Sequence, residues 1–250
     1  MKKTIILLLL ATAISAAAQT PQALMQQGNE AYTKGDFAAA VQAYNAVLDA
    51  GYQSADLYYN LGNAHYRLEE YGLSILNYER ALRLRPNFRD AKENLDLVDS
   101  KTEDNISQLP EIFLVQWAHS VVAWFSSTGW RVCTLILLAI LGALVVLFLL
   151  SRDYSWRKGA LIGGIATLVL LLLCIACTIS STVRYNRHNQ AIVTVPMAVV
   201  KSSPEENSVD KLILHEGTKV GIDETLGEWH KIHISDGNSG WLTATDVTII

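Results

Sequence analysis

Two long apolar runs without a single charge decide what this chain can fold into. The first is "VCTLILLAILGALVVLFLL" at residues 132–150, and the second is "ALIGGIATLVLLLLCIACTISST" at residues 160–182. Each has the length of about 20 residues that a helix needs to cross a bilayer, and a buried core helix of that length normally carries some charge. We therefore predict a multidomain membrane protein with a two-helix transmembrane hairpin, its helices at residues 130–150 and 159–182 and its loop at residues 151–158.

The first 18 residues, "MKKTIILLLLATAISAAA", have the layout of a secretory signal peptide. Two lysines precede an apolar stretch, and three consecutive alanines then offer a small-residue cleavage site before Gln19. An uncleaved membrane anchor is the alternative, although the apolar stretch of about ten residues is short for a span. We predict that residues 1–18 export the N-terminus, with cleavage left open.

Export of the N-terminus determines the predicted topology of the hairpin. The first membrane helix would return the chain to the cytoplasm and the second would take it out again. The loop "SRDYSWRK", which holds Arg152, Arg157 and Lys158 against Asp153, would then lie inside, as the positive-inside rule prefers. The predicted location is the bacterial inner membrane, crossed twice, with both soluble domains in the periplasm.

Both predicted soluble parts are acidic. Residues 19–104 hold 8 Lys+Arg and 13 Asp+Glu, and residues 188–250 hold 4 and 9, so each carries a net charge of about −5. Nucleic acid is bound through clusters of lysine and arginine, which these parts lack. The charge balance therefore argues against a nucleic-acid partner and favours a protein partner.

The N-terminal half contains an internal repeat with a period of 34 residues. The segment "GNEAYTKGDFAAAVQAYNAVL" from Gly28 aligns with "GNAHYRLEEYGLSILNYERAL" from Gly62. The matching pairs are Gly28/Gly62, Asn29/Asn63, Tyr32/Tyr66, Phe37/Tyr71, Val41/Ile75, Tyr44/Tyr78 and Leu48/Leu82. This period and pattern resemble the tetratricopeptide repeat, a helix–turn–helix unit that stacks into a solenoid.

The resemblance predicts an α-helical solenoid of two repeats plus a capping helix at residues 21–104. Pro86 ends the second repeat because proline cannot continue a helix interior. The polar stretch that follows has Ala91, Leu95 and Val98 on one side, which is typical of a capping helix. Two repeats are close to the lower limit of a stable stack, which favours stabilisation by a further partner or a neighbouring copy.

In this repeat family the first helix of each pair lines a concave groove, so the resemblance implies a protein-binding groove. Asparagines there could hold an extended peptide backbone, tyrosines could offer flat amphipathic surface, and Arg67 could meet a carboxylate. The groove residues so implied are Asn29, Tyr32, Tyr59, Asn63, Tyr66 and Arg67. For Tyr32 and Tyr66, packing between helices is an equally open interpretation. A clamp for a C-terminal carboxylate is not expected. Asn29 and Asn60 match its two asparagines, but Met25, Asp90 and Asn94 stand at the positions of its cations.

Residues 109–128, "LPEIFLVQWAHSVVAWFSST", connect the repeats to the first membrane helix. Their aromatic residues fall on one face at helical spacing, and indole rings favour the headgroup level of a bilayer. We predict an interfacial amphipathic helix here, with Trp117, Trp124 and Trp130 at the membrane interface. The alternative is that this helix packs under the repeats.

Residues 188–250 switch to short runs of alternating polarity separated by turn residues, which predicts β-strands. Their order, with Ser-Ser-Pro, Glu-Gly-Thr-Lys-Val, Trp-x-Lys-Ile and Gly-Trp-Leu, is similar to the bacterial SH3 domain and implies a small β-barrel. Trp229 and Trp241 are the candidates for an SH3-like groove, although one of them could be core. His230 and His233, three apart on a strand, would point to opposite faces, so no metal site is predicted.

Motifs of common enzymes are missing from the sequence. It contains no G-x-S-x-G, no Walker A motif and no H-E-x-x-H, and its three cysteines all lie in the predicted membrane helices. We therefore predict a non-enzymatic protein with no catalytic residues and no cofactor.

Over nearly its full length, this order of modules resembles the BatE family of the Bacteroides aerotolerance operon. The resemblance implies a scaffold or adaptor on the extracytoplasmic face of the membrane, in an aerotolerance or stress-related complex. Its implied partners are membrane proteins with von Willebrand A domains and a MoxR-type ATPase system. The alternative is a cell-wall module in which the barrel binds peptidoglycan and the repeats recruit a wall enzyme.

Overall fold

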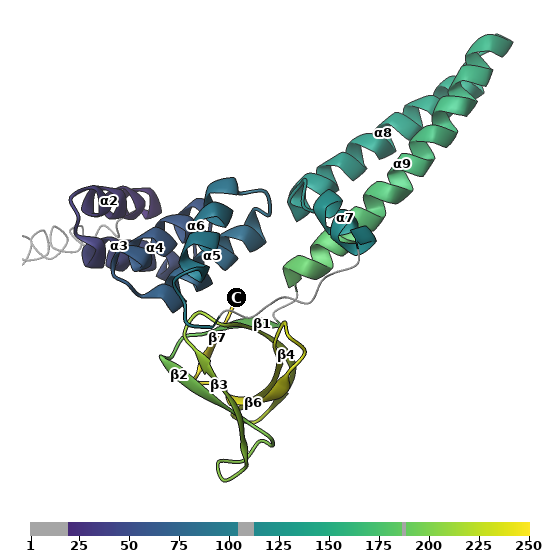
Figure 1. Cartoon of the computed structure of the whole chain (residues 1–250). Helices are drawn as coiled ribbons and strands as arrows, with labels where there is room; N and C mark the ends of the chain where they lie inside the picture. The colour runs from purple at the N-terminus through teal and green to yellow at the C-terminus, as the bar shows by residue number, and fades with distance from the viewer. Residues whose placement is uncertain (1–19, 105–112, 187–188) are drawn as a thin grey trace, which may run out of the picture.

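The computed structural model describes residues 20–104, 113–186 and 189–250. The predicted signal peptide and the first four residues of the predicted interfacial helix lie outside these ranges. Figure 1 shows a block of helices, a curled sheet beside it, and a long two-helix arm that extends away from both.

Five helices form the N-terminal block, as the repeat predicted. They are α2 (Pro21–Thr33), α3 (Phe37–Asp49), α4 (Ala55–Arg67), α5 (Tyr71–Leu84) and α6 (Arg89–Asp99). The side chains of Thr20, Asp36 and Ser54 accept backbone N–H groups at the starts of α2, α3 and α4. The pairs α2/α3 and α4/α5 are the two repeats, and α6 packs against α5.

Two apolar helices form the arm: α8 (Ser127–Leu150) and α9 (Tyr154–Asn186). By length and composition, both could cross a membrane, over residues 128–150 and 154–183. Leucines along the arm are exposed, for example Leu135 by 65% and Leu173 by 60%, so the apolar surface of the arm is left uncovered by the chain itself. Lipid would be the favourable surroundings for such a surface.

The arm differs from its predicted bounds at the turn. Most of the predicted loop 151–158 is helical, since α9 already begins at Tyr154, and the connection is reduced to residues 151–153. The physical reason is that "YSWRK" contains neither proline nor glycine, so nothing stops the helix from starting there.

The C-terminal part is a seven-stranded antiparallel sheet. Its strands are β1 (Gln190–Val193), β2 (Met197–Lys201), β3 (Asp210–His215), β4 (Lys219–Leu226), β5 (Trp229–His233), β6 (Ser239–Thr243) and β7 (Val247–Ile249). The strand order is β3-β2-β6-β5-β4-β1-β7, so the sheet is open, with β3 and β7 at its edges. It curls around a core of small and branched residues that includes Val200, Ile232 and Leu242 (Figure 1).

The sheet packs against the end of the repeats. Ile192 of β1 and Ile250 lie in one buried cluster with Tyr58, Ile75 and Val98 from the helices. Sheet and helices approach closely, since a Cβ on Gly217 would lie only 2.8 Å from the Ile75 Cδ1 atom. The apolar end of a short solenoid is therefore covered by the chain's own sheet. We predict that this contact gives the repeats the stabilisation that we expected from a partner. We call residues 20–104 together with residues 189–250 the docked unit.

Polar contacts surround this apolar contact. The Lys219 ammonium lies 2.7 Å from the Glu79 carboxylate, and the Arg80 guanidinium donates to the carbonyl of Ile249 at 2.8 Å. Arg83 donates to the carbonyl of Ile250. These two arginines of α5 thus bind carbonyl groups at the C-terminal end of the edge strand β7, where that of Ile249 belongs to the strand itself.

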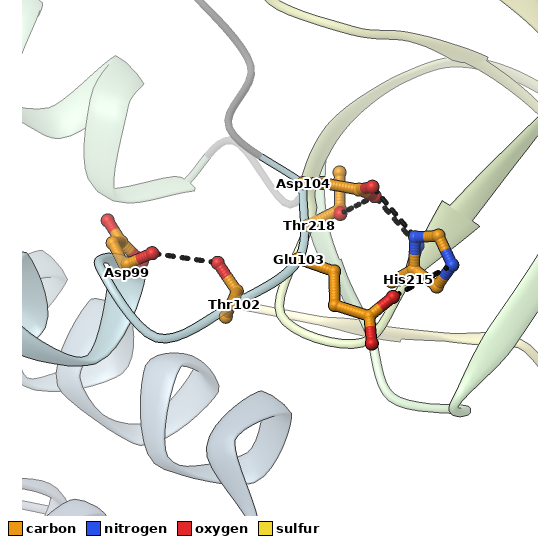
Figure 2. A network of polar contacts seen from close by, with 6 residues as sticks. All are labelled: Asp99, Thr102, Glu103, Asp104, His215 and Thr218. Atoms are coloured by element: carbon orange, nitrogen blue, oxygen red, sulfur yellow. Dashed lines mark hydrogen bonds and ion pairs between the residues drawn. The ribbon is translucent and has the colours of Figure 1, made fainter.

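The Asp104 carboxylate joins the end of the repeats to the end of β3 and the loop after it (Figure 2). Its Oδ2 atom accepts the backbone N–H of His215 at 2.7 Å and the hydroxyl of Thr218 at 2.6 Å. Its Oδ1 atom lies 2.8 Å from Nδ1 of His215, whose Nε2 atom lies 3.3 Å from Glu103. One carboxylate thus holds three donors of the sheet.

This network predicts that the contact between the sheet and the repeats becomes less stable as the pH rises. The hydrogen bond to Asp104, with the charges of Asp104 and Glu103, raises the pKa of His215. Burial raises the pKa of Asp104, but the three hydrogen bonds outweigh it and hold that pKa below its usual value. The contribution of the imidazolium is complete below the ordinary histidine pKa of about 6.5 and is lost as the pH rises through the raised value. The carboxylate contribution is lost only at the acid end, as the pH falls through its lowered pKa.

The measurement is the protection of α5 and α6 amides against hydrogen exchange at about pH 6 and about pH 8, corrected for intrinsic rates. We expect less protection at the higher pH. His215→Gln should remove most of that difference, whereas His233→Gln, on the exposed side of the same sheet, should keep it. Equal protection of the wild-type helices at both pH values would contradict the role of the imidazolium.

Candidate functional site

The first helices of the repeats form a pocket on one side of the solenoid. It has a volume of about 260 Å³ and takes its lining from α2, α3 and α4. The lining residues are Asn29, Tyr32, Thr33, Tyr44, Asn60 and Asn63. All six side chains are polar and none is charged, so the pocket can form hydrogen bonds but offers no ion pair. It therefore suits a neutral polar group.

A hydrogen-bonded Asn–Tyr–Asn set positions the pocket. The Tyr44 hydroxyl donates to Oδ1 of Asn29 at 2.8 Å, and Nδ2 of Asn60 donates to the same oxygen at 3.1 Å. The set therefore joins both helices of the first repeat to the first helix of the second.

The same set recurs one repeat later. The Tyr78 hydroxyl donates to Oδ1 of Asn63 at 2.6 Å, and Nδ2 of Asn94 donates to it at 2.9 Å. Asn94 belongs to α6, so the capping helix supplies the asparagine that a third repeat would supply. Both sets follow the 34-residue period, since Asn60 and Asn94 are also 34 residues apart.

Close helix approach places each tyrosine under its asparagine. A Cβ on Gly62 would lie 2.7 Å from Cε1 of Tyr78, and a Cβ on Gly28 would lie 2.4 Å from Cε1 of Tyr44. Only glycine leaves room for these rings. Burial raises the pKa of Tyr44 to about 12 and also raises that of Tyr78, so both hydroxyls keep their protons and act as donors.

The asparagines keep unused groups after these bonds are made. Within the described residues, no hydrogen bond uses Nδ2 of Asn29, Nδ2 of Asn63 or Oδ1 of Asn60. The three asparagines therefore offer two fixed donors and one fixed acceptor. A peptide backbone offers the complementary carbonyl and N–H groups.

The other predicted groove residues have different surroundings. Tyr32 lines the pocket and packs edge-on against Phe37 at 5.2 Å, while the Arg67 guanidinium lies 4.3 Å above that same Phe37 ring. Tyr59 packs against Phe88 at 4.9 Å, and Tyr66 lies 6.1 Å from the ring of Tyr71. The structure thus brings Asn29, Tyr32 and Asn63 into one pocket and leaves Tyr59, Tyr66 and Arg67 outside its lining.

Both tryptophans of the predicted SH3-like groove are half-buried on the outward face of the sheet. Trp241 pairs with Lys231 across β5 and β6, and Trp229 pairs with Thr243, so the two indoles occupy diagonal positions on that face. Neither belongs to the buried core cluster of the sheet.

The two histidines of β5 serve separate contacts. Nδ1 of the buried His230 lies 2.9 Å from the Thr225 hydroxyl, and Nδ1 of the exposed His233 lies 2.7 Å from the Asp223 carboxylate. Among the described residues, no group of three or more metal-binding side chains is gathered in one place.

The predicted interface tryptophans divide into two kinds. Trp117 and Trp124 are 61% and 64% exposed, on and just after α7 (Phe113–Val122). Trp130, by contrast, is only 8% exposed and donates its indole N–H to the carbonyl of Val122 at 2.8 Å. An indole donor near an uncapped helix end finds its acceptor there, so Trp130 fastens α7 to α8.

Four residues of the site were not predicted as such: Tyr44, Tyr78, Asn60 and Asn94. Their signal was present in the sequence, because each pair repeats at the 34-residue period together with Asn29 and Asn63. A polar residue that repeats together with a buried aromatic one is evidence for a hydrogen bond between them.

Comparison with known families agrees with this part of the structure. Residues 25–93 match the tetratricopeptide repeat family, over a range that begins in α2 and ends in α6. No curated protein matches the chain. Repeats of this family are typical of protein–protein interaction and not of catalysis.

Proposed function

We propose that this protein is a non-enzymatic adaptor whose repeat pocket binds an extended segment of a partner protein. The observation that carries the proposal is the asparagine set, in which buried tyrosines fix Asn29 and Asn63 with their amide donors free. A backbone ligand suits this pocket because its carbonyl and N–H groups recur along the chain and carry no charge.

The adaptor would act at the bacterial inner membrane. The uncovered apolar surface of α8 and α9 supports a hairpin that crosses the bilayer twice. Contact between the repeats and the sheet supports an even number of crossings, since Asp104 and His215 can meet only on one side. With Arg157 and Lys158 at the turn of the hairpin, the positive-inside rule favours a periplasmic docked unit.

The curled sheet supports the SH3-like assignment, in which Trp229 and Trp241 are the groove residues. With the order of modules, it also supports the BatE family resemblance. The complex we propose is accordingly an aerotolerance or stress-related one of Bacteroidetes, with von Willebrand A-domain membrane proteins and a MoxR-type ATPase as partners.

A peptidoglycan-binding role is the second candidate. It is favoured by the outward position of Trp229 and Trp241, since flat apolar rings can stack on sugars. Capture of wall fragments that depends on these tryptophans would support it, whereas protein capture that depends on Asn63 supports the adaptor.

The adaptor is tested by Asn63→Asp. The new carboxylate can still accept from Tyr78 and Asn94, so the fold should be kept, but the free amide donor is replaced by a charged acceptor that repels a peptide carbonyl. Loss of one hydrogen bond with an added repulsion should reduce binding by about tenfold or more. The measurement is the amount of partner chain crosslinked in intact membranes to tagged full-length protein.

Asn45→Asp is the matched control. Asn45 is exposed on α3 and is not among the pocket residues, so this variant makes the same charge change elsewhere on the repeats. Equal capture by the two variants and the wild type would refute binding at this pocket.

A further inference from the structure

A second pocket lies in the arm, between α8 and α9 near their turn. It is a groove of about 190 Å³ whose lining is entirely apolar. The lining residues are Leu141, Leu144, Val145, Phe148, Ala160, Leu161, Gly164, Ile165 and Leu168. On each helix they lie on one face and together span about two turns, so the groove runs parallel to the arm over roughly 12 Å.

The groove is open along its side. Leu161 and Ile165 on its rim are 51% and 57% exposed. A Cβ added at Gly164 would meet no atom within 4 Å, so the missing side chain contributes directly to the empty space. The two helices therefore do not fill the groove themselves.

Arg157 provides a positive charge at the end of the groove that is nearer the turn between α8 and α9. The Arg157 guanidinium lies 5.1 Å above the ring of Phe148, which is itself part of the lining. Lys158 follows it and Arg152 precedes it, with Asp153 as the only acid in the segment 151–158. Within the described residues, these three cations form no ion pair.

We propose that this groove binds an anionic phospholipid, with one acyl chain along α8 and α9 and the phosphate at Arg157 and Lys158. The proposal rests on the membrane placement of the proposed function. An arginine suits this role because its planar guanidinium matches phosphate geometry, and basic pockets between membrane helices are typical sites for anionic headgroups. If the turn is cytoplasmic, the site faces the leaflet in which anionic lipids attract basic segments.

Charge complementarity distinguishes this occupant from a further helix. A helix packed on the groove would need small residues and close backbone approach, and it would gain nothing from three cations at one end. A lipid uses both features, since its apolar chain and its negative headgroup belong to one molecule and Arg157 lies against Phe148 of the groove lining.

The test uses full-length protein in phosphatidylcholine nanodiscs that contain a small fraction of lipid spin-labelled on its acyl chain. We expect labelled phosphatidylglycerol to be immobilised about fivefold more strongly than labelled phosphatidylcholine. Arg157→Gln should remove most of this preference, and Gly164→Leu should reduce immobilisation by filling the groove. Arg131→Gln repeats the charge change at the other end of the arm, and Gly142→Leu adds the same side chain where a Cβ also meets no atom within 4 Å.

The outcomes separate this inference from the proposed function. If the protein fails to float with liposomes, the membrane placement itself is wrong. If it floats but shows no preference for phosphatidylglycerol, or a preference that both site variants keep, only the lipid site is refuted. A groove filled by a second copy, seen as a dimer in nanodiscs that Gly164→Leu dissociates, would also overturn the proposal.

Discussion

Ile192→Ala is expected to lower the free energy of unfolding of the docked unit by about 2–5 kcal/mol, the range for truncating a buried isoleucine. Ile192 is fully buried on β1, yet its cluster is built mostly from helix residues, among them Tyr58, Ile75 and Val98. The cavity would therefore open at the contact between sheet and helices. We expect β1 and the helices α5 and α6 to lose stability together.

Ile232→Ala is the matched control for this prediction. Ile232 is equally buried, but it belongs to the cluster inside the sheet. Hydrogen exchange of the full chain under native conditions separates the two variants, because it reports stability segment by segment. The increase in exchange rate of the α5 and α6 amides should be larger for Ile192→Ala. The increase in exchange rate of the β5 and β6 amides should be larger for Ile232→Ala. Unchanged exchange of α5 and α6 in Ile192→Ala would mean that the sheet does not stabilise the repeats.

The repeats were predictable because the sequence signals that specify them lie within single repeats, close together in the chain. A 34-residue period and a stop at Pro86 both act within one or two helices. The apolar arm was predictable for the same reason, since the composition of one helix shows that its apolar side chains would be unfavourable in water.

The docking of the sheet on the repeats was not predictable from the same signals. Its contacts join segments far apart in the chain, as do Asp104 and His215, which are 111 positions apart. In the sequence, Ile192 has the pattern of an apolar position in an alternating strand, and Gly217 has that of a glycine in a turn. Neither pattern marks a contact with the helices. Nothing in either local pattern shows that the partner surface is the end of the repeats and not the inside of a barrel.

The site was predicted in part, and the reason lies in what each asparagine does. Family resemblance pointed to Asn29 and Asn63, but it assigned the whole side chain to a ligand. In the structure the oxygen of each amide is used by a tyrosine and a second asparagine, which leaves the nitrogen for binding. Which atom of the amide bonds within the protein depends on the side chains around it. The sequence alone does not show which side chains these are.

Tyr78→Ala is expected to destabilise the repeats by about 3–5 kcal/mol, as for other large buried aromatic residues. Tyr78 is 1% exposed, and its ring fills the space that Gly62 leaves between α4 and α5. Removing the ring leaves a cavity that the glycine cannot fill, and it also takes the hydroxyl away from Asn63. Tyr52→Ala, at a position that is 56% exposed, should change stability by less than about 0.5 kcal/mol.

Tyr78→Phe separates packing from hydrogen bonding. It keeps the ring, so the loss should be only about 0.5–1.5 kcal/mol, the net contribution of one hydrogen bond. The Asn63 amide would then be held by Asn94 alone and would be less firmly oriented toward the pocket. A folded Tyr78→Phe protein should therefore capture its partner more weakly than the wild type, by an amount between those of Asn45→Asp and Asn63→Asp. If capture is unchanged while the unfolding free energy falls as expected, the tyrosine stabilises the repeats without positioning the asparagine for binding.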